Sequence, residues 1–244
     1  ASEQTGLLRD TPLIATGHDT QFAIIGSGAK AGQPVLSSGT WEILMTRSQD
    51  CTCNSRELDL GITTEFDAQP GMYNIGINYM GSGTLEWIKK HFYPREDYDV
   101  MVREAKEIPP GSEGVKVRTD FYNAEDTGPA GAIEGLTLHT TRGHVFRAAL
   151  EGLSVKMKES LGALEKAGQF QASSVICVGG GSKNDLWNQI RADACGIPIT
   201  TINQKETTVL GAAMFVFQGT GVVSSLEEAR ANIDFAPVVF QPLK

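Results

Sequence analysis

The second half of the chain alternates apolar segments of strand length with segments of helical periodicity. The longest segment, residues 141–167, repeats apolar side chains at intervals of three and four, which predicts one core-facing helix. Further strands are expected at residues 175–178 and 198–202, each followed by a helix. Because strands that alternate with helices build a sheet covered by helices, we expect an α/β fold.

The first half of the chain is less regular. Small residues separate four short apolar segments, which predict a meander of strands: residues 13–15, 22–25, 34–36 and 42–45. Residues 47–130 are largely polar apart from helices expected at 78–91 and 98–107, and we interpret them as an insertion. No linker or low-complexity run interrupts the sequence, so we expect a single domain over residues 1–244.

Charge and cysteine content argue against several classes of function. The chain has 29 acidic and 21 basic residues and a formal charge of -8, and it shows no basic cluster, so we expect no nucleic-acid partner. No stretch is long and apolar enough to span a bilayer, so we expect no membrane partner. The four cysteines have neither zinc-site nor disulfide-framework spacing, which predicts no bound metal, free thiols and a cytoplasmic location.

One acidic group stands beside a histidine near the N-terminus, in the sequence Gly17-His18-Asp19-Thr20. We expect a strand that stops at Gly17, presents Asp19 and resumes at Phe22. Taken alone, the segment fits a turn in which Asp19 accepts a backbone N–H. It also fits a single general base at the mouth of a cleft. The motifs further along the chain favour the second interpretation.

Two turns are candidate nucleotide contacts. The segment 37–40, Ser-Ser-Gly-Thr, offers backbone N–H groups and hydroxyls to phosphate oxygens, although an ordinary hairpin turn has the same composition. The glycines at 179–181 follow an apolar run and precede a helix that we expect Ser182 and Asp185 to cap. Such a turn lets adenine or ribose lie against bare backbone, or it simply joins strand to helix. Residues 26–31 have the spacing of a dinucleotide fingerprint, but we expect a strand after them, which excludes that function.

These motifs, taken in order, resemble the FGGY family of carbohydrate kinases. A further stretch, residues 131–151, fits the second signature of that family at every constrained position. The resemblance extends over residues 13–231 and is greatest for the branch that phosphorylates L-fuculose, with the L-rhamnulose branch next. It implies a ribonuclease H-like (actin-like ATPase) domain with a mixed sheet flanked by helices. It also implies that residues 1–244 are the C-terminal, nucleotide-binding half of such a kinase, with the N-terminal half absent from this chain.

The resemblance also implies a reaction and a set of site residues. The reaction is ATP-dependent phosphorylation of a ketose, with conversion of L-fuculose to L-fuculose 1-phosphate favoured, and the cofactors are ATP and Mg²⁺. Asp19 matches the family's catalytic base, and His18 matches a sugar contact. The matches on the nucleotide side are Gly39 and Thr40 for the terminal phosphates, Asn78 beside them, and Gly179, Gly180 and Asn184 for adenosine. Glu86 stands where the L-rhamnulose branch has glutamine, which leaves its role open.

Several alternatives remain open from the sequence. The chain could act on L-rhamnulose or on another ketose or polyol, or it could be a non-catalytic nucleotide-binding module of the actin-like superfamily. The carboxylate of Asp19 favours a kinase, since a scaffold would not need it there. We expect a ketose and the N-terminal kinase domain as partners, and we expect the chain alone to be inactive. Formation of homo-oligomers is a further open possibility, through the apolar surface on which the N-terminal domain would dock.

Overall fold

A seven-stranded mixed sheet forms the centre of the computed structural model, which describes residues 2–121 and 131–243. Its strand order is β3-β4-β2-β1-β7-β8-β9. The strands are β1 (Val35–Ser38), β2 (Trp41–Ser48), β3 (Ile62–Phe66), β4 (Tyr73–Met80), β7 (Val175–Val178), β8 (Ile199–Thr201) and β9 (Val238–Phe240). Neighbouring strands run antiparallel except in the centre, where β1, β7 and β8 are parallel. The mixed sheet expected from the sequence is confirmed.

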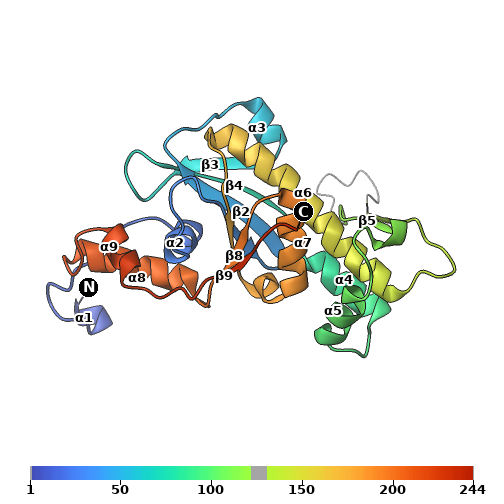
Figure 1. The fold of residues 1–244 in the computed structure, drawn as a ribbon. Helices are drawn as coiled ribbons and strands as arrows, with labels where there is room; N and C mark the ends of the chain where they lie inside the picture. The colour runs from blue at the N-terminus through green and yellow to red at the C-terminus, as the bar shows by residue number, and fades with distance from the viewer. Residues whose placement is uncertain (1, 122–130, 244) are drawn as a thin grey trace.

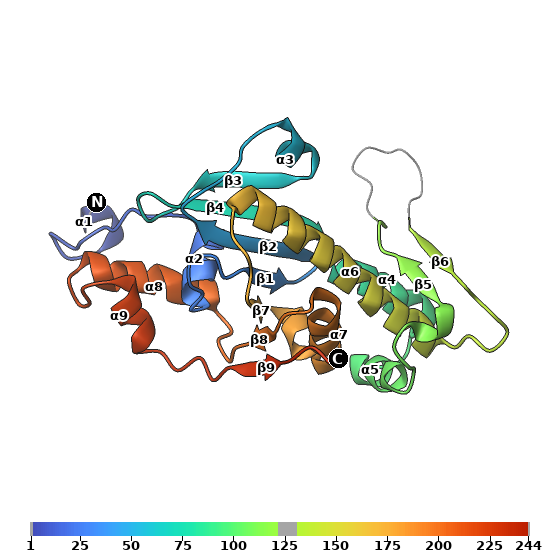
Figure 2. The ribbon, with the colours of Figure 1, turned by 45° about the horizontal axis from the view of Figure 1, so that its top comes forward.

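Helices cover both faces of this sheet (Figure 2). They are α1 (Ser2–Thr5), α2 (Asp19–Gly26), α3 (Ser55–Asp59), α4 (Ser82–Phe92), α5 (Tyr98–Lys106), α6 (Arg142–Gly168), α7 (Asp185–Cys195), α8 (Thr207–Gly219) and α9 (Leu226–Ala231). On one face, α6 buries Met157 and Leu161 against Leu36 and Leu44, as its periodicity predicts. Within residues 2–121 and 131–243, no helix is both long enough and apolar enough to cross a membrane.

The opposite face carries α2, with α8 and α9 packed behind it (Figure 1). Ile24 of α2 lies in one core cluster with Val35 and Ile176 of the sheet. Ile25 turns the other way, toward Met214 and neighbouring residues of α8 and α9. Residues 22–25 are therefore helical and residues 13–15 are in no strand, so the strands expected in both places are wrong. Asp19 consequently stands at the first turn of a helix instead of in a break between two strands.

The interpretation of residues 47–130 as one insertion is also wrong in its first part. Strands β3 and β4 lie in this range, and both belong to the central sheet. The residues from 73 to 80 carry apolar side chains at every second position, which is the period of a strand. Asn78 is accordingly in β4, and the helix that follows begins at Ser82.

The remainder of that range builds a second core at one end of the molecule. There α4, α5 and the first turns of α6 pack around residues such as Leu85, Met101 and Phe146. A separate two-stranded sheet, β5 (Lys116–Arg118) with β6 (Ala132–Glu134), lies beside them, as Figure 2 shows. The last part of the expected insertion, residues 122–130, lies outside the described residues.

Candidate active site

A pocket of about 750 Å³ lies between the β1–β2 turn, the α4 and α5 helices, and the turn that leads into α7. Four of the residues singled out from the sequence line it: Gly39, Thr40, Gly180 and Asn184. Glu86 lines the same pocket, together with Tyr98, Asp99, Lys106 and Lys183, which the sequence motifs do not reveal. The two turns expected to contact a nucleotide therefore share one pocket. They come together because β1 pairs with β7, where Ser37 lies opposite Val178, 141 positions further along the chain.

Backbone hydrogen bonds hold the Gly39–Thr40 turn against the start of α4. The Gly39 N–H donates to the Trp41 carbonyl at 3.1 Å, which closes the hairpin. The carbonyl of Gly39 accepts from the Ser82 N–H, and that of Thr40 accepts from the Gly81 N–H, each at 3.0 Å. Because both carbonyls are engaged on the α4 side, the turn is fixed in place at the rim of the pocket.

A buried ion pair lies directly beneath this turn. Arg191 of α7 donates to Glu42 of β2 at 2.8 Å, and each side chain is 1% exposed. The Ser38 hydroxyl accepts from Arg191 at 2.7 Å and donates to Glu42 at 2.6 Å. Burial raises the pKa of the Glu42 carboxyl, while Arg191 and Ser38 act in the opposite direction by favouring its ionised form. The guanidinium also lies over the Trp187 ring, 3.6 Å from its centroid.

The three glycines at 179–181 differ in what surrounds them. Gly179 has a φ of 87°, and a Cβ there would stand 2.6 Å from the Ser38 carbonyl oxygen. At Gly181 a Cβ would stand 2.0 Å from the Ser38 hydroxyl oxygen. Nothing lies within 4 Å of the corresponding position at Gly180. The outer glycines are therefore required by close packing on β1, whereas Gly180 presents open backbone to the pocket.

Asn184 caps α7 and leaves one polar group unsatisfied. Its Oδ1 accepts from the Trp187 N–H at 3.2 Å, so Asn184 is the N-cap residue. Ser182 instead donates to the Gly179 carbonyl at 2.7 Å, and the expected capping pair of Ser182 and Asp185 is wrong. Asn184 is 6% exposed, and its Nδ2 is buried without a hydrogen-bond partner. A buried donor beside an open pocket is the kind of group that a polar ligand satisfies.

Asp19 lies apart from this pocket, at the start of α2. Its Oδ1 accepts from the Thr20 N–H at 2.8 Å, and His18 Nδ1 lies 3.2 Å from the same oxygen. The side chain is 81% exposed. The hydrogen bond with His18, and after it the one with the Thr20 N–H, lowers the pKa of the Asp19 carboxyl below its ordinary value. The group is thus an ionised and accessible carboxylate at neutral pH.

His18 and Asn78 line a second, smaller pocket of about 310 Å³. Glu65 of β3 and Asn74 of β4 line it as well, and Glu65 accepts from His18 Nε2 at 2.8 Å. The structure therefore separates Asn78 from the residues with which the motifs group it, since it does not line the 750 Å³ pocket. In the part of the chain that the structure describes, no three His, Cys, Asp or Glu side chains are grouped so as to hold a metal ion.

Comparisons with known proteins agree with this fold. Residues 35–218 match the model of the FGGY family of carbohydrate kinases, C-terminal domain. The L-fuculokinase of Escherichia coli (strain K12) is 46% identical over 243 residues, which are 99% of this chain and 51% of that protein. The L-fuculokinase of Haemophilus influenzae is 44% identical over 229 residues, which are 91% of this chain and 48% of that protein.

Solved structures show the same architecture. The crystal structure of xylulose kinase from Rhodospirillum rubrum superposes with a TM-score of 0.86 at 22% identity, over 99% of this chain and 49% of that one. The chain thus spans about half the length of the curated relatives it matches. A family match over residues 35–218, identities of 44–46% and the sheet described above lead to one conclusion. This chain belongs to the FGGY family of carbohydrate kinases, in which it corresponds to the C-terminal domain.

Proposed function

We propose that the chain is the nucleotide-binding half of an ATP-dependent ketose kinase, with L-fuculose as the favoured substrate. The observation that carries this proposal is the single pocket lined by both the Gly39–Thr40 turn and the Gly180–Asn184 segment. The identity of 46% to an L-fuculokinase over 99% of the chain supports the choice of sugar. By comparison, the xylulose kinase of Bacillus subtilis is 28% identical over 98% of the chain.

The pocket residues fit a nucleoside triphosphate. The open backbone at Gly180 and the unsatisfied Nδ2 of Asn184 suit a flat, polar group such as adenosine. The Gly39 N–H already donates to Trp41, so the Thr40 hydroxyl and N–H are the groups of this turn that suit phosphate oxygens. Magnesium, held mainly by phosphate oxygens and water, would neutralise charge on the transferred phosphoryl group.

Asp19 is proposed as the general base. The attacking hydroxyl oxygen of the ketose forms a bond to the γ-phosphorus, the bond from that phosphorus to the ADP oxygen breaks, and the hydroxyl proton passes to Asp19. Because its pKa is lowered, Asp19 is ionised and ready to accept that proton at neutral pH. His18, directly beside it, is proposed as a sugar contact. General bases contribute roughly 10²–10⁴ in rate, and most of the remaining acceleration in phosphoryl transfer comes from positioning and charge stabilisation.

The N-terminal half of the relatives, which this chain does not span, is proposed to supply the rest of the cleft. The chain spans 51% of the Escherichia coli L-fuculokinase, so a partner domain of similar size would complete the sugar site. We propose that the 244-residue chain alone phosphorylates nothing. Measurable phosphorylation of L-fuculose, L-rhamnulose or D-xylulose by this chain in isolation would contradict that part of the proposal.

The kinase proposal is tested in the protein that contains both halves. Asp19→Asn should reduce kcat by roughly 10²–10⁴ while the Kd for ATP stays near the wild-type value, because the amide keeps the shape of the side chain but cannot accept the proton. Glu107→Gln is the matched control, since Glu107 is an exposed carboxylate at the end of α5. A coupled ADP-release assay with the three ketoses measures kcat, and isothermal titration measures ATP binding. Wild-type turnover in Asp19→Asn would exclude Asp19 as the base.

A further inference from the structure

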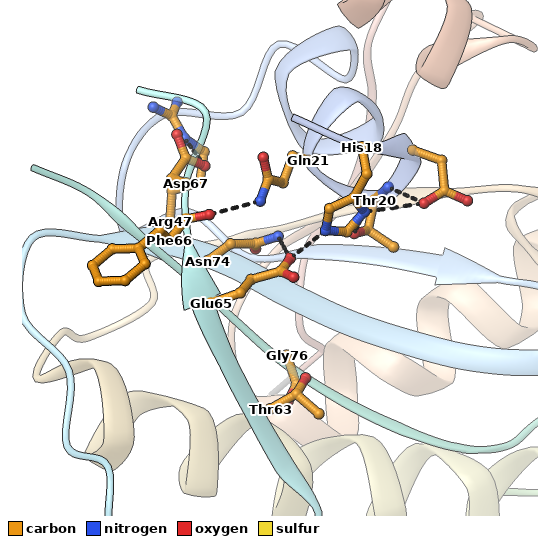
Figure 3. Close-up of polar contacts among 11 residues, drawn as sticks. His18, Thr20, Gln21, Arg47, Thr63, Glu65, Phe66, Asp67, Asn74 and Gly76 are labelled. Carbon is orange, nitrogen blue, oxygen red and sulfur yellow. Dashed lines mark hydrogen bonds and ion pairs between the residues drawn. The ribbon is translucent and has the colours of Figure 1, made fainter. Parts of the chain in front are cut away.

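Glu65 of the edge strand β3 contacts His18, as Figure 3 shows, and His18 in turn contacts Asp19. It lies on β3 directly opposite Asn74 of β4 in the strand register. The Asn74 side-chain N–H donates to Glu65 Oε1 at 2.8 Å, and His18 Nε2 lies 2.8 Å from the same oxygen. Asn74 is 4% exposed, so its amide is fixed in the protein interior. The Glu65 carboxylate is therefore held in one place by a buried neighbour, and His18 is held by Glu65.

This arrangement decides which nitrogen of His18 carries a proton. An ionised carboxylate only accepts hydrogen bonds, so Nε2 must be the protonated nitrogen that donates to Glu65. The other nitrogen, Nδ1, lies 3.2 Å from Asp19 Oδ1 and 3.0 Å from Thr20 Oγ1. When the ring is neutral, Nδ1 can only accept, and the Thr20 hydroxyl is the donor available to it. When the ring is charged, Nδ1–H can donate to Asp19 instead.

We propose that Glu65 is a positioning residue for the transfer reaction, which fixes the His18 ring and thereby sets whether Asp19 is hydrogen-bonded to His18 or free. The proposal rests on the function proposed above, since it matters for turnover only if Asp19 is the base. A base that is bound by Nδ1–H must give up that hydrogen bond before it accepts a proton from the sugar. Glu65 acts on this step through His18 and does not itself touch the reacting atoms.

The charged groups that face His18 both favour its protonated form. Asp19 faces the ring from α2 and Glu65 faces it from β3, while Asn74 and Asn78 of β4 are neutral. Arg47, shown near this cluster in Figure 3, is paired with Asp67 at 3.1 Å. Within the described ranges, no lysine or arginine forms an ion pair with Asp19 or Glu65. The hydrogen bond to Glu65, and then the one to Asp19, raises the pKa of His18 above its ordinary value.

The proposal is tested by titrating His18 in the 244-residue chain and following its ring carbons and protons by NMR. Glu65→Gln keeps a carbonyl that can accept from Nε2, so the ring stays in place while the negative charge is lost. We expect the His18 titration midpoint to move to lower pH in Glu65→Gln, and by more than in Asp19→Asn, because Glu65 is the larger of the two influences. Glu107→Gln controls for the loss of one acidic group and should leave the midpoint unchanged. An unchanged midpoint in Glu65→Gln overturns the proposal.

A second measurement connects this titration to turnover in the protein with both halves. We expect kcat to rise with pH through the His18 midpoint, as the neutral ring releases Asp19, and we expect this rise to occur at lower pH in Glu65→Gln. A rise at the same pH in both proteins would overturn the positioning role. The outcomes separate the two proposals. If Asp19 is not the base, Asp19→Asn turns over normally even though the NMR midpoints shift. If Glu65 does not position His18, Asp19→Asn is still impaired but the His18 midpoint in Glu65→Gln does not move.

Discussion

Arg191 and Glu42 lie 149 positions apart in the sequence and form a buried ion pair at 2.8 Å. Through Ser38, this pair contacts the strand that leads into the Gly39–Thr40 turn. Through its own backbone, Arg191 belongs to α7, the helix that Asn184 caps. The two turns of the 750 Å³ pocket are therefore connected by one charged network, and we expect the pocket to keep its shape only while that network is intact.

Removal of the acidic partner should unfold the domain more easily. In Glu42→Ala, the Arg191 charge remains buried without its carboxylate, and the loss of one partner of a buried ion pair typically costs about 3–5 kcal/mol. Urea unfolding followed by circular dichroism measures the free energy of unfolding. Glu107→Ala removes an exposed carboxylate and serves as the control, with an expected change within about 0.5 kcal/mol. A Glu42→Ala protein as stable as this control would show that the pair does not hold the pocket together.

Two neighbouring glycines should respond differently to alanine. In Gly181→Ala the new methyl group would stand 2.0 Å from the Ser38 hydroxyl oxygen, so the turn or Ser38 must move. We expect a lower melting temperature and weaker ATP binding, with a cost of roughly 1–3 kcal/mol in stability. In Gly180→Ala the methyl group meets no protein atom within 4 Å but occupies pocket space, so ATP binding should weaken while the melting temperature stays unchanged. Thermal unfolding and isothermal titration of both variants measure these quantities, and equal melting temperatures would contradict the packing argument.

Helical periodicity predicts α6, α7 and α8, and short apolar segments predict β7 and β8. No strand is expected at Val238–Phe240, where β9 completes the sheet. The same approach fails at α2, where four apolar residues fit a strand as well as a helix. What decides for a helix is a distant contact. A Cβ at Gly26 would stand 1.9 Å from the Thr207 carbonyl oxygen, and one at Gly211 would stand 2.0 Å from that of Phe22. Two glycines thus allow α2 and α8 to cross closely, and no local sequence pattern predicts that crossing.

The candidate site divides in the same way. Gly39, Thr40 and Gly180 lie in turns that can be found from the sequence, because turns depend on residues that are adjacent in the chain. Asn184 comes from the family resemblance alone, since the local capping pattern points to Ser182 instead. Glu65 cannot be found that way, because it lies 47 positions after His18. The two side chains meet only because β3 pairs with β4 in the sheet. The alternation of residues 73–80 is the available signal for β4, and with that strand assigned, Glu65 could be placed on its neighbour.

Asn184 should separate the stability of α7 from nucleotide binding. Aspartate is as good an N-cap as asparagine, so Asn184→Asp should keep the free energy of unfolding close to that of the wild type. It lacks the Nδ2 donor, however, and should bind ATP more weakly. Asn184→Ala loses both the cap and the donor, and should also be less stable by about 0.5–2 kcal/mol. ATP binding by Asn184→Asp that equals the wild-type value, measured by isothermal titration, would exclude Nδ2 as a nucleotide contact.

His18→Gln should change the pH dependence of turnover in the protein that contains both halves. The hydrogen bond with His18 is the largest influence that lowers the pKa of Asp19, so its loss should raise that pKa toward the ordinary value. A base with a higher pKa is protonated at higher pH, and the acidic limb of kcat/KM should therefore move upward. The second rise, which we attribute to release of Asp19 by neutral His18, should disappear because glutamine does not titrate. Loss of a sugar contact lowers kcat/KM at every pH but does not shift the pH at which it rises. The pH of the acidic limb is therefore the quantity to measure. An unmoved acidic limb would show that His18 does not influence the pKa of Asp19.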